Sequence, residues 1–205
     1  MHLYNLIAQG EHETLEFKYE INDPRKIART LVAFANTRGG RLLVGIRDNG
    51  IISGVSIDEE YYMVESGAKL YSRPEIDFKL KIHPVPNGKH VLEFIIESST
   101  SKPHTVIYSD KSPEAYIRVH DENILAHPVW IKVQERLKSP REIKYTGKHN
   151  RLLTYIKGKN VRTLETIMKE AFLSKRESME IITDLVASGV MEIETTNSGS
   201  VFKLK

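Results

Sequence analysis

Three carboxylates in the first fifty residues are of the type that binds divalent metal ions. Glu11 precedes an alternating segment, residues 14–19, in which Glu16 and Lys18 share one face, and Asp48 follows the next apolar run. If these segments form adjacent strands, the three acids converge at one edge and hold Mg²⁺ or Mn²⁺ for phosphodiester attack, with Lys18 stabilising the developing charge. The alternative is structural, because strands and turns commonly expose carboxylates and Asp48 begins an Asp-Asn-Gly turn.

A second group of chemistry-bearing residues lies in the last third of the chain. Lys175, Arg176 and Ser178 occupy the first turn of a predicted helix that follows another helix after a short turn. In a helix-turn-helix, the second helix presents such residues to the major groove of DNA. Lys203, in the last predicted strand, is placed where a wing contacts phosphate. This pattern predicts binding to duplex DNA.

The same helix also carries charge of the opposite sign. Three acids on it would repel phosphate: Glu177, Glu180 and Asp184. They leave a second interpretation open, in which this segment is a protein–protein module that forms a homodimer. The loop before the helix pair holds cations that are placed to approach a phosphate backbone: Lys157, Lys159 and Arg162.

Three arginines flank the central apolar run of the first half: Arg38, Arg41 and Arg47. Together with the basic residues that begin the first long helix, these arginines would form a phosphate-binding face. A solvated helix face explains the basic residues of that helix equally well. The segment 40–47 lacks the Lys-Ser/Thr pair of a phosphate loop, so ATP binding is not expected. No cysteines and no histidine pair at helical spacing are present, so zinc is not expected either.

Composition sets the broad class of protein. The chain has 205 residues, 40% of them hydrophobic and 28% charged, which is ordinary for a packed soluble protein. A formal net charge of +3 is too small to imply a nucleic-acid partner by itself. No segment approaches the roughly 20 apolar residues that span a bilayer. The N-terminus also lacks a secretory pattern, so we expect no membrane partner and a cytoplasmic location.

Hydrophobic periodicity predicts two domains and an α+β fold class. Strands and helices in mixed order indicate an α/β domain over residues 1–137, which ends in a helix with the only tryptophan. Residues 138–147 contain proline, glycine and basic residues without an apolar period, which is typical of a linker. Residues 148–205 contain three helical patterns and then two alternating segments around an Asn-Ser-Gly turn. That order is typical of a winged helix-turn-helix domain.

Several segments of the first domain resemble a known family. They are Gly10-Glu11 with residues 15–18, the run 33–50 with its Phe-Ala-Asn-Thr-x-Gly-Gly core, and Lys102-Pro103-His104 with residues 115–119. This set is similar to the Schlafen AlbA_2 domain over about residues 3–135. One difference is the turn after Arg118, where the family tends to have glycine and serine and this chain has His-Asp-Glu-Asn. Two acids there would weaken the approach of phosphate.

The resemblance carries two functional implications. It implies nucleic-acid binding, and in bacterial members the domain often precedes a winged helix in transcriptional regulators. In animal relatives with endoribonuclease activity, two glutamates and an aspartate carry metal-dependent cleavage, and the matching positions here are Glu11, Glu16 and Asp48. We therefore expect a DNA-binding transcriptional regulator whose partner is DNA or RNA and whose binding needs no cofactor. The alternative is a Schlafen-type endoribonuclease that uses Mg²⁺ or Mn²⁺.

Overall fold

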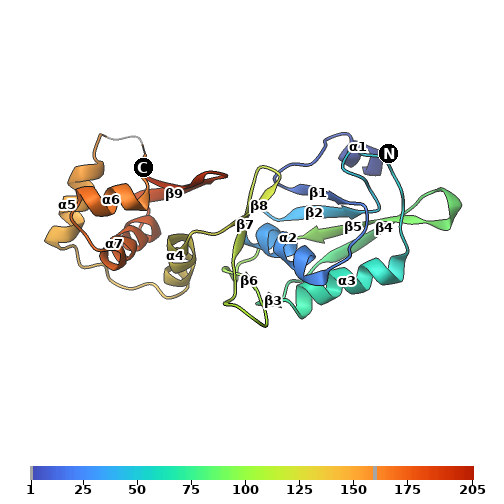
Figure 1. Cartoon of the computed structure of the whole chain (residues 1–205), viewed down its shortest axis with the longest axis horizontal. Helices are drawn as coiled ribbons and strands as arrows, with labels where there is room; N and C mark the ends of the chain where they lie inside the picture. The colour runs from blue at the N-terminus through green and yellow to red at the C-terminus, as the bar shows by residue number, and fades with distance from the viewer. Residues whose placement is uncertain (1, 159–160) are drawn as a thin grey trace. The chain divides into compact units, whose positions relative to one another are not determined.

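The structure is a computed structural model that describes residues 2–158 and 161–205. Lys159, one of the loop cations named above, lies outside the described residues. The chain divides into two compact units, Met1–Leu125 and Ala126–Lys205, and Figure 1 shows the helices and strands of each. Together they form a mixed α+β protein. None of the described helices is long and apolar enough to cross a membrane.

The first unit is built on a four-stranded sheet with the strand order β1-β2-β5-β4. β1 (Leu15–Lys18) pairs in parallel with β2 (Gly40–Val44), and β5 (His90–Ile96) pairs antiparallel with both β2 and β4 (Lys79–Pro84). The two segments that the sequence analysis assumed to be adjacent strands are therefore neighbours. β2 is buried on both faces, which explains its nearly continuous apolar sequence.

Helices cover the two faces of this sheet (Figure 1). α2 (Pro24–Asn36) and α3 (Ile57–Lys69) pack on the face that includes Leu42 and Phe94. α1 (His2–Ile7) packs on the opposite face, against Phe17 and Leu43. Because side chains alternate along a strand, the residues on either side of Phe17, which are Glu16 and Lys18, point to the α2 side of β1.

Shorter elements complete the first unit. A 3₁₀ turn, η1 (Pro86–Gly88), joins β4 to β5, and β3 (Ser72–Arg73) pairs with β6 (Thr105–Val106). β7 (Tyr116–Val119) forms a hairpin with β8 (Glu122–Leu125).

One predicted hairpin in the first unit is reduced to a single bridge. The Asp-Asn-Gly turn at residues 48–50 is of the type that joins two strands in a β-hairpin, but here it joins segments that share only an isolated bridge between Ile46 and Ile52. Gly45 adopts a φ of +97°, which ends β2 before such a ladder can form. β2 pairs instead with β1 and β5.

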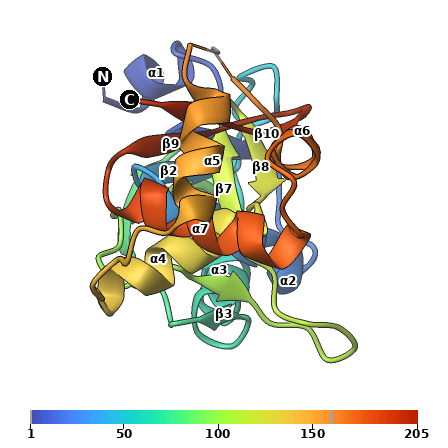
Figure 2. The ribbon, with the colours of Figure 1, turned by 90° about the vertical axis from the view of Figure 1, so that its left-hand side faces the viewer.

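The second unit contains four helices and a hairpin within its described residues (Figure 2). They are α4 (Pro128–Lys138), α5 (Gly147–Ile156), α6 (Leu164–Glu170), α7 (Lys175–Ala187) and the antiparallel pair β9 (Met191–Thr196) and β10 (Gly199–Leu204). The order from α5 to β10 is the one that the sequence predicts.

The division between the units differs from the predicted boundary after residue 137. The sequence analysis placed the α4 segment at the end of the first domain. In the structure Val129 and Val133 of α4 belong to the same hydrophobic core as Ile182 of α7. Apolar burial therefore places α4 with the second unit.

Candidate nucleic-acid interface

The first turn of α7 holds two exposed cations. The helix begins with a capping box, in which Ser174 Oγ accepts the backbone N–H of Glu177 at 3.3 Å and the Glu177 carboxylate accepts that of Ser174 at 2.9 Å. This fixes the helix start directly before Lys175 and Arg176, whose side chains are exposed. Among the described residues neither cation has an ion-pair partner. Their charges are therefore free to interact with phosphate.

The first acid of α7 is neutralised beside this turn. The Lys148 ammonium of α5 forms an ion pair with the Glu177 carboxylate. The hydrogen bond from Lys148, followed by those from Ser174, lowers the pKa of Glu177 to about 2. Glu177 therefore remains ionised and is occupied by its own partners, which reduces its repulsion of an approaching phosphate.

The other two acids of α7 are also held by cations from the same unit. Glu180 lies 2.7 Å from the Lys132 ammonium, whose hydrogen bond is the main cause of the lowered pKa of Glu180. Asp184 contacts the Arg136 guanidinium. Arg141 is within 4 Å of both carboxylates, at 3.4 and 3.7 Å. The acids that favoured a protein–protein role in the sequence are thus compensated internally.

The net charge of the chain is concentrated in the second unit. Residues 126–205 contain fifteen Lys and Arg against nine Asp and Glu, a formal charge of +6. Residues 1–125 contain fifteen against eighteen, a formal charge of −3. The whole-chain value of +3 hides this asymmetry. Attraction for a polyanion is therefore a property of the second unit.

Two other predicted DNA contacts are not free in the structure. Ser178 is 0% exposed, contrary to the prediction, because it lies on the core-facing side of α7 with Ile181 and Ile182. Lys203 of β10 has its ammonium 3.0 Å from Glu192 and 3.2 Å from Glu194, so its charge is shared across the hairpin. Of the three residues predicted at the start of α7, Lys175 and Arg176 are exposed and have no ion-pair partner among the described residues.

In the first unit Glu16 lies in a buried ion-pair network. Arg118 of β7, 3% exposed, donates to Glu16 Oε2 at 2.7 Å, and Glu16 itself is 7% exposed. The Lys18 ammonium lies 2.6 Å from Glu16 Oε1. Arg118 also donates to the backbone oxygens of His12 at 3.0 Å and Glu13 at 3.3 Å. Both oxygens of Glu16 are thus engaged by cations, and Lys18 serves as one of them.

The predicted trio of metal-binding carboxylates is not assembled. Glu11 precedes β1 and its carboxylate accepts the backbone N–H of Phe17 at 2.8 Å. Asp48 is exposed in the turn beyond the carboxyl end of β2. Because β1 and β2 are parallel, the segments before β1 and after β2 leave opposite ends of the sheet. No group of three His, Asp or Glu side chains in the described ranges could hold a metal ion. These residues therefore do not fit the Mg²⁺ or Mn²⁺ that the family resemblance implies.

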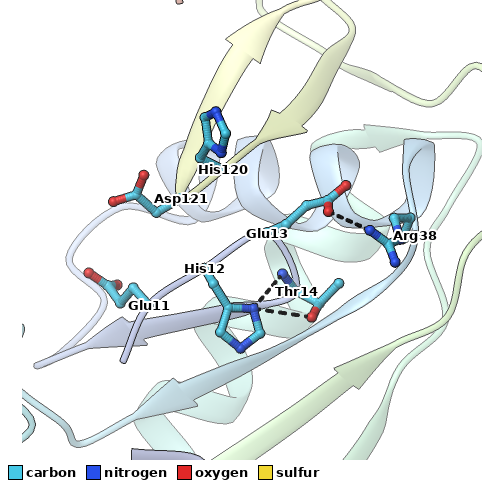
Figure 3. A pocket seen from close by; sticks show the side chains of 7 residues that line it. All are labelled: Glu11, His12, Glu13, Thr14, Arg38, His120 and Asp121. Carbon is cyan, nitrogen blue, oxygen red and sulfur yellow. Dashed lines mark hydrogen bonds and ion pairs between the residues drawn. The ribbon is translucent and has the colours of Figure 1, made fainter. Parts of the chain in front are cut away.

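A hollow of about 570 Å³ opens beside the start of β1 (Figure 3). Its lining comes from the loop before β1, the turn before β2 and the β7–β8 turn: Glu11, His12, Glu13, Thr14, Arg38, His120 and Asp121. Arg38 donates to Glu13 at 2.7 Å, which leaves the hollow with a formal charge of −2 when its histidines are neutral. This charge disfavours phosphate.

The three arginines around β2 do not form one face. Arg38 is paired with Glu13, and Arg41 is paired with the buried Glu93 of β5. Arg47 lies beyond the other end of β2, with its guanidinium 5.1 Å from the centre of the Tyr19 ring. The structure therefore separates Arg47 from the other two.

Comparison with protein families identifies the first unit. The family model described as Schlafen, AlbA_2 matches residues 11–127, more than half of the chain. The chain belongs to the Schlafen AlbA_2 family. The matched AlbA_2 region contains the whole Arg118–Glu16 network and the hollow beside β1.

Two solved structures are similar to this AlbA_2 protein. The DIP2311 protein from Corynebacterium diphtheriae matches 92% of the chain at 18% identity with a TM-score of 0.46, and the match spans 34% of that protein. The N-terminal domain of a RecG-related protein from Nitrosomonas europaea matches 62% of the chain at 23% identity with a TM-score of 0.41, and the match spans 93% of that structure. The chain thus spans about a third of the Corynebacterium protein.

Two residues with unusual surroundings were not singled out from the sequence. Arg118 was noted as part of the AlbA_2 motif, but its partner Glu16 lies 102 residues away, so no local pattern pairs them. Phe172, in the turn between α6 and α7, is 85% exposed. The signal for Phe172 was available, because an aromatic residue between two amphipathic helices that belongs to neither apolar stripe is expected to face solvent.

Proposed function

We propose that this AlbA_2 protein binds nucleic acid and that its second unit is a winged helix that contacts duplex DNA. The observation that carries the proposal is the exposed, unpaired Lys175–Arg176 pair at the start of α7. In a helix-turn-helix the start of the second helix enters the major groove, and here α6 and α7 would form the pair and β9–β10 the wing. Action as a transcriptional regulator in the cytoplasm belongs to the same proposal.

The charge asymmetry supports this assignment over contact through the AlbA_2 unit alone. The second unit has a formal charge of +6, and the AlbA_2 unit has −3 with an acidic hollow. Counterion release from the DNA backbone rewards cations that can reach phosphate. The competing function, a dimerisation module, relied on the acids of α7. Their ion pairs with Lys132, Arg136 and Lys148 weaken that argument.

The test compares two double variants of the full chain by fluorescence anisotropy with a labelled DNA duplex over a range of salt concentrations. Lys175→Ala with Arg176→Ala removes the proposed contacts. Lys79→Ala with Lys81→Ala removes the same charge from exposed positions of β4. If each lost cation contacts one phosphate, the first variant lowers the salt slope by about 2 and the affinity by roughly 10- to 100-fold. The β4 variant leaves both nearly unchanged.

Equal weakening by the two variants would contradict the proposal, because it would indicate diffuse attraction without a defined interface. Failure of the wild-type chain to bind duplex at low salt would also refute it. The same assay with a labelled RNA shows whether the protein binds DNA or RNA more tightly. A cleavage check on both probes with added Mn²⁺ addresses the endoribonuclease alternative, for which the carboxylate geometry gives no support.

A further inference from the structure

Phe172 is held out into solvent by the turn between α6 and α7. Its neighbours Ala171 and Leu173 are 3% and 6% exposed, so they anchor the turn in the core on both sides of the ring. The turn is also fixed by the backbone N–H of Leu173, which donates to the Met168 carbonyl at 3.0 Å. Phe172 adopts a φ of +51° and is 85% exposed. A bulky residue at positive φ is strained, and such strain is commonly associated with function.

A hollow of about 430 Å³ lies beside the Phe172 ring. It is bordered by polar groups of α5, of which Tyr155 is half-buried, and by the end of α6: Asn150, Arg151, Thr154, Tyr155 and Glu170. The lining thus combines an aromatic face with amide, guanidinium, hydroxyl and carboxylate groups. A nucleobase has the matching chemistry, because it has a flat π-face for stacking and an edge of hydrogen-bond donors and acceptors.

Cations lie close to this hollow. The ion pair between Lys148 of α5 and Glu177 of α7 brings the start of α5 beside the first turn of α7. Arg151 borders the hollow itself and also a neighbouring depression that includes Lys148. Lys175 and Arg176 follow Phe172 by three and four residues. An aromatic ring set among cations is the combination that binds single-stranded nucleic acid, where bases stack and phosphates are neutralised.

We propose that Phe172 and the hollow beside it bind an unpaired nucleobase. The protein then prefers a duplex with a single-stranded tail to the same duplex with blunt ends. This inference rests on the proposed function, because it names the class of nucleic acid that the second unit selects. The charge of the second unit favours a nucleic acid over the second unit of another copy of the chain, because that contact would bring like charges together.

The experiment measures binding of the full chain to one duplex sequence in two forms, blunt and tailed. Stacking of one base strengthens binding to the tailed probe by about 5- to 100-fold. Phe172→Gly reduces this ratio to near one and leaves affinity for the blunt probe unchanged. Phe172→Trp preserves the ratio. Tyr62→Ala removes another exposed aromatic ring, from α3, and serves as the matched control.

Two further measurements separate a lost contact from a damaged fold. Glycine relieves the positive φ, so Phe172→Gly raises the melting temperature while it abolishes the preference for the tail. A 2-aminopurine base placed in the tail changes its fluorescence on binding to the wild type and not on binding to the glycine variant. Together these outcomes assign the effect to the ring.

Several results would overturn the inference. One such result is that the wild type binds both probes equally, and another is that Phe172→Gly retains the preference for the tail. If Lys175→Ala with Arg176→Ala still weakens duplex binding in either case, the proposed function survives without the base site. Light scattering could show that Phe172→Gly converts a dimer to a monomer, which would place the ring in a contact between copies. Absence of binding to either probe would refute the proposed function itself.

Discussion

Removing the Arg118 guanidinium is expected to destabilise the AlbA_2 unit selectively. Arg118→Met deletes the donors to Glu16 and to the backbone oxygens of His12 and Glu13, and it leaves the Glu16 carboxylate buried. Breaking a buried ion pair by removing one partner costs about 3–5 kcal/mol. Lys18, 2.6 Å from Glu16 and partly exposed, retains part of the compensation, so the lower end of that range, about 3 kcal/mol, is expected. For a unit of this size the melting temperature falls by roughly 10 °C.

Thermal unfolding can assign this loss to one unit of the intact chain. Circular dichroism follows both units, whereas the fluorescence of Trp130, the single tryptophan, follows the second unit through α4. Arg118→Met lowers the transition seen by circular dichroism and leaves the Trp130 transition in place. Lys26→Met, at an exposed position of α2 in the same unit, is the control and changes the unfolding free energy by no more than about 0.5 kcal/mol.

A double variant tests the electrostatic reason directly. Glu16→Leu combined with Arg118→Met leaves no buried charge in the network, so it is less destabilised than Arg118→Met alone. The reasoning is refuted if Arg118→Met melts within about 2 °C of the wild type. It is also refuted if the double variant is less stable than the single one, because the uncompensated carboxylate would then not be the source of the loss.

Three more perturbations follow from the geometry. Burial of Glu93 opposes its ionisation, but hydrogen bonds from His83 and Arg41 outweigh burial and lower the pKa of Glu93. The stabilising contribution of Glu93 is therefore present above the ordinary carboxyl pKa and is lost as the pH falls through the lowered pKa. In melts between pH 3 and pH 6, Glu93→Gln makes the fall of the melting temperature toward low pH less steep. An unchanged pH dependence in this variant would contradict the assignment. The Ser178 hydroxyl is buried and has no hydrogen-bond partner in the described residues. Ser178→Ala therefore raises the unfolding free energy by up to about 1 kcal/mol and leaves the affinity for duplex DNA unchanged. Weaker DNA binding by this variant would restore Ser178 as a contact. Added Mn²⁺ at a hundred times a typical dissociation constant would stabilise a true metal site by about 2.7 kcal/mol; we expect no shift in the melting of the AlbA_2 unit, and a shift that Glu16→Ala removes would reinstate the carboxylate site.

Local patterns in the sequence predicted the helices and strands better than they predicted which helices, strands and side chains contact one another. Alternation over residues 14–19 predicted β1, and the helix start predicted at Lys175 is where α7 begins. These features depend on neighbours a few residues away. Ser178 shows that a local pattern can also be misread, because it precedes Ile182 by four residues and so shares the buried stripe of α7.

The site depended on contacts that local patterns do not encode. Glu16 has the sequence features of a catalytic acid, and its partner Arg118 becomes its neighbour only when β7 packs against α2 and the loop before β1. The direction of strand pairing rules against the predicted metal site. Because β1 and β2 are parallel, Glu11 before β1 and Asp48 after β2 lie at opposite ends of the strand pair. In α7 the charge pattern alone suggested repulsion of DNA, and the ion pairs that neutralise it come from α4, α5 and the segment between them.

The long separation of Glu16 and Arg118 also has a consequence for protein synthesis. β1 is an edge strand, and the side chain that neutralises its buried acid is 102 residues further along the chain. At about 5–20 residues per second, the ribosome supplies Arg118 roughly 5–20 s after Glu16. Throughout that interval the Glu16 carboxylate lacks the guanidinium that pairs with it in the folded AlbA_2 unit. The ion-pair network around Glu16 can therefore form only after most of the AlbA_2 unit has been synthesised.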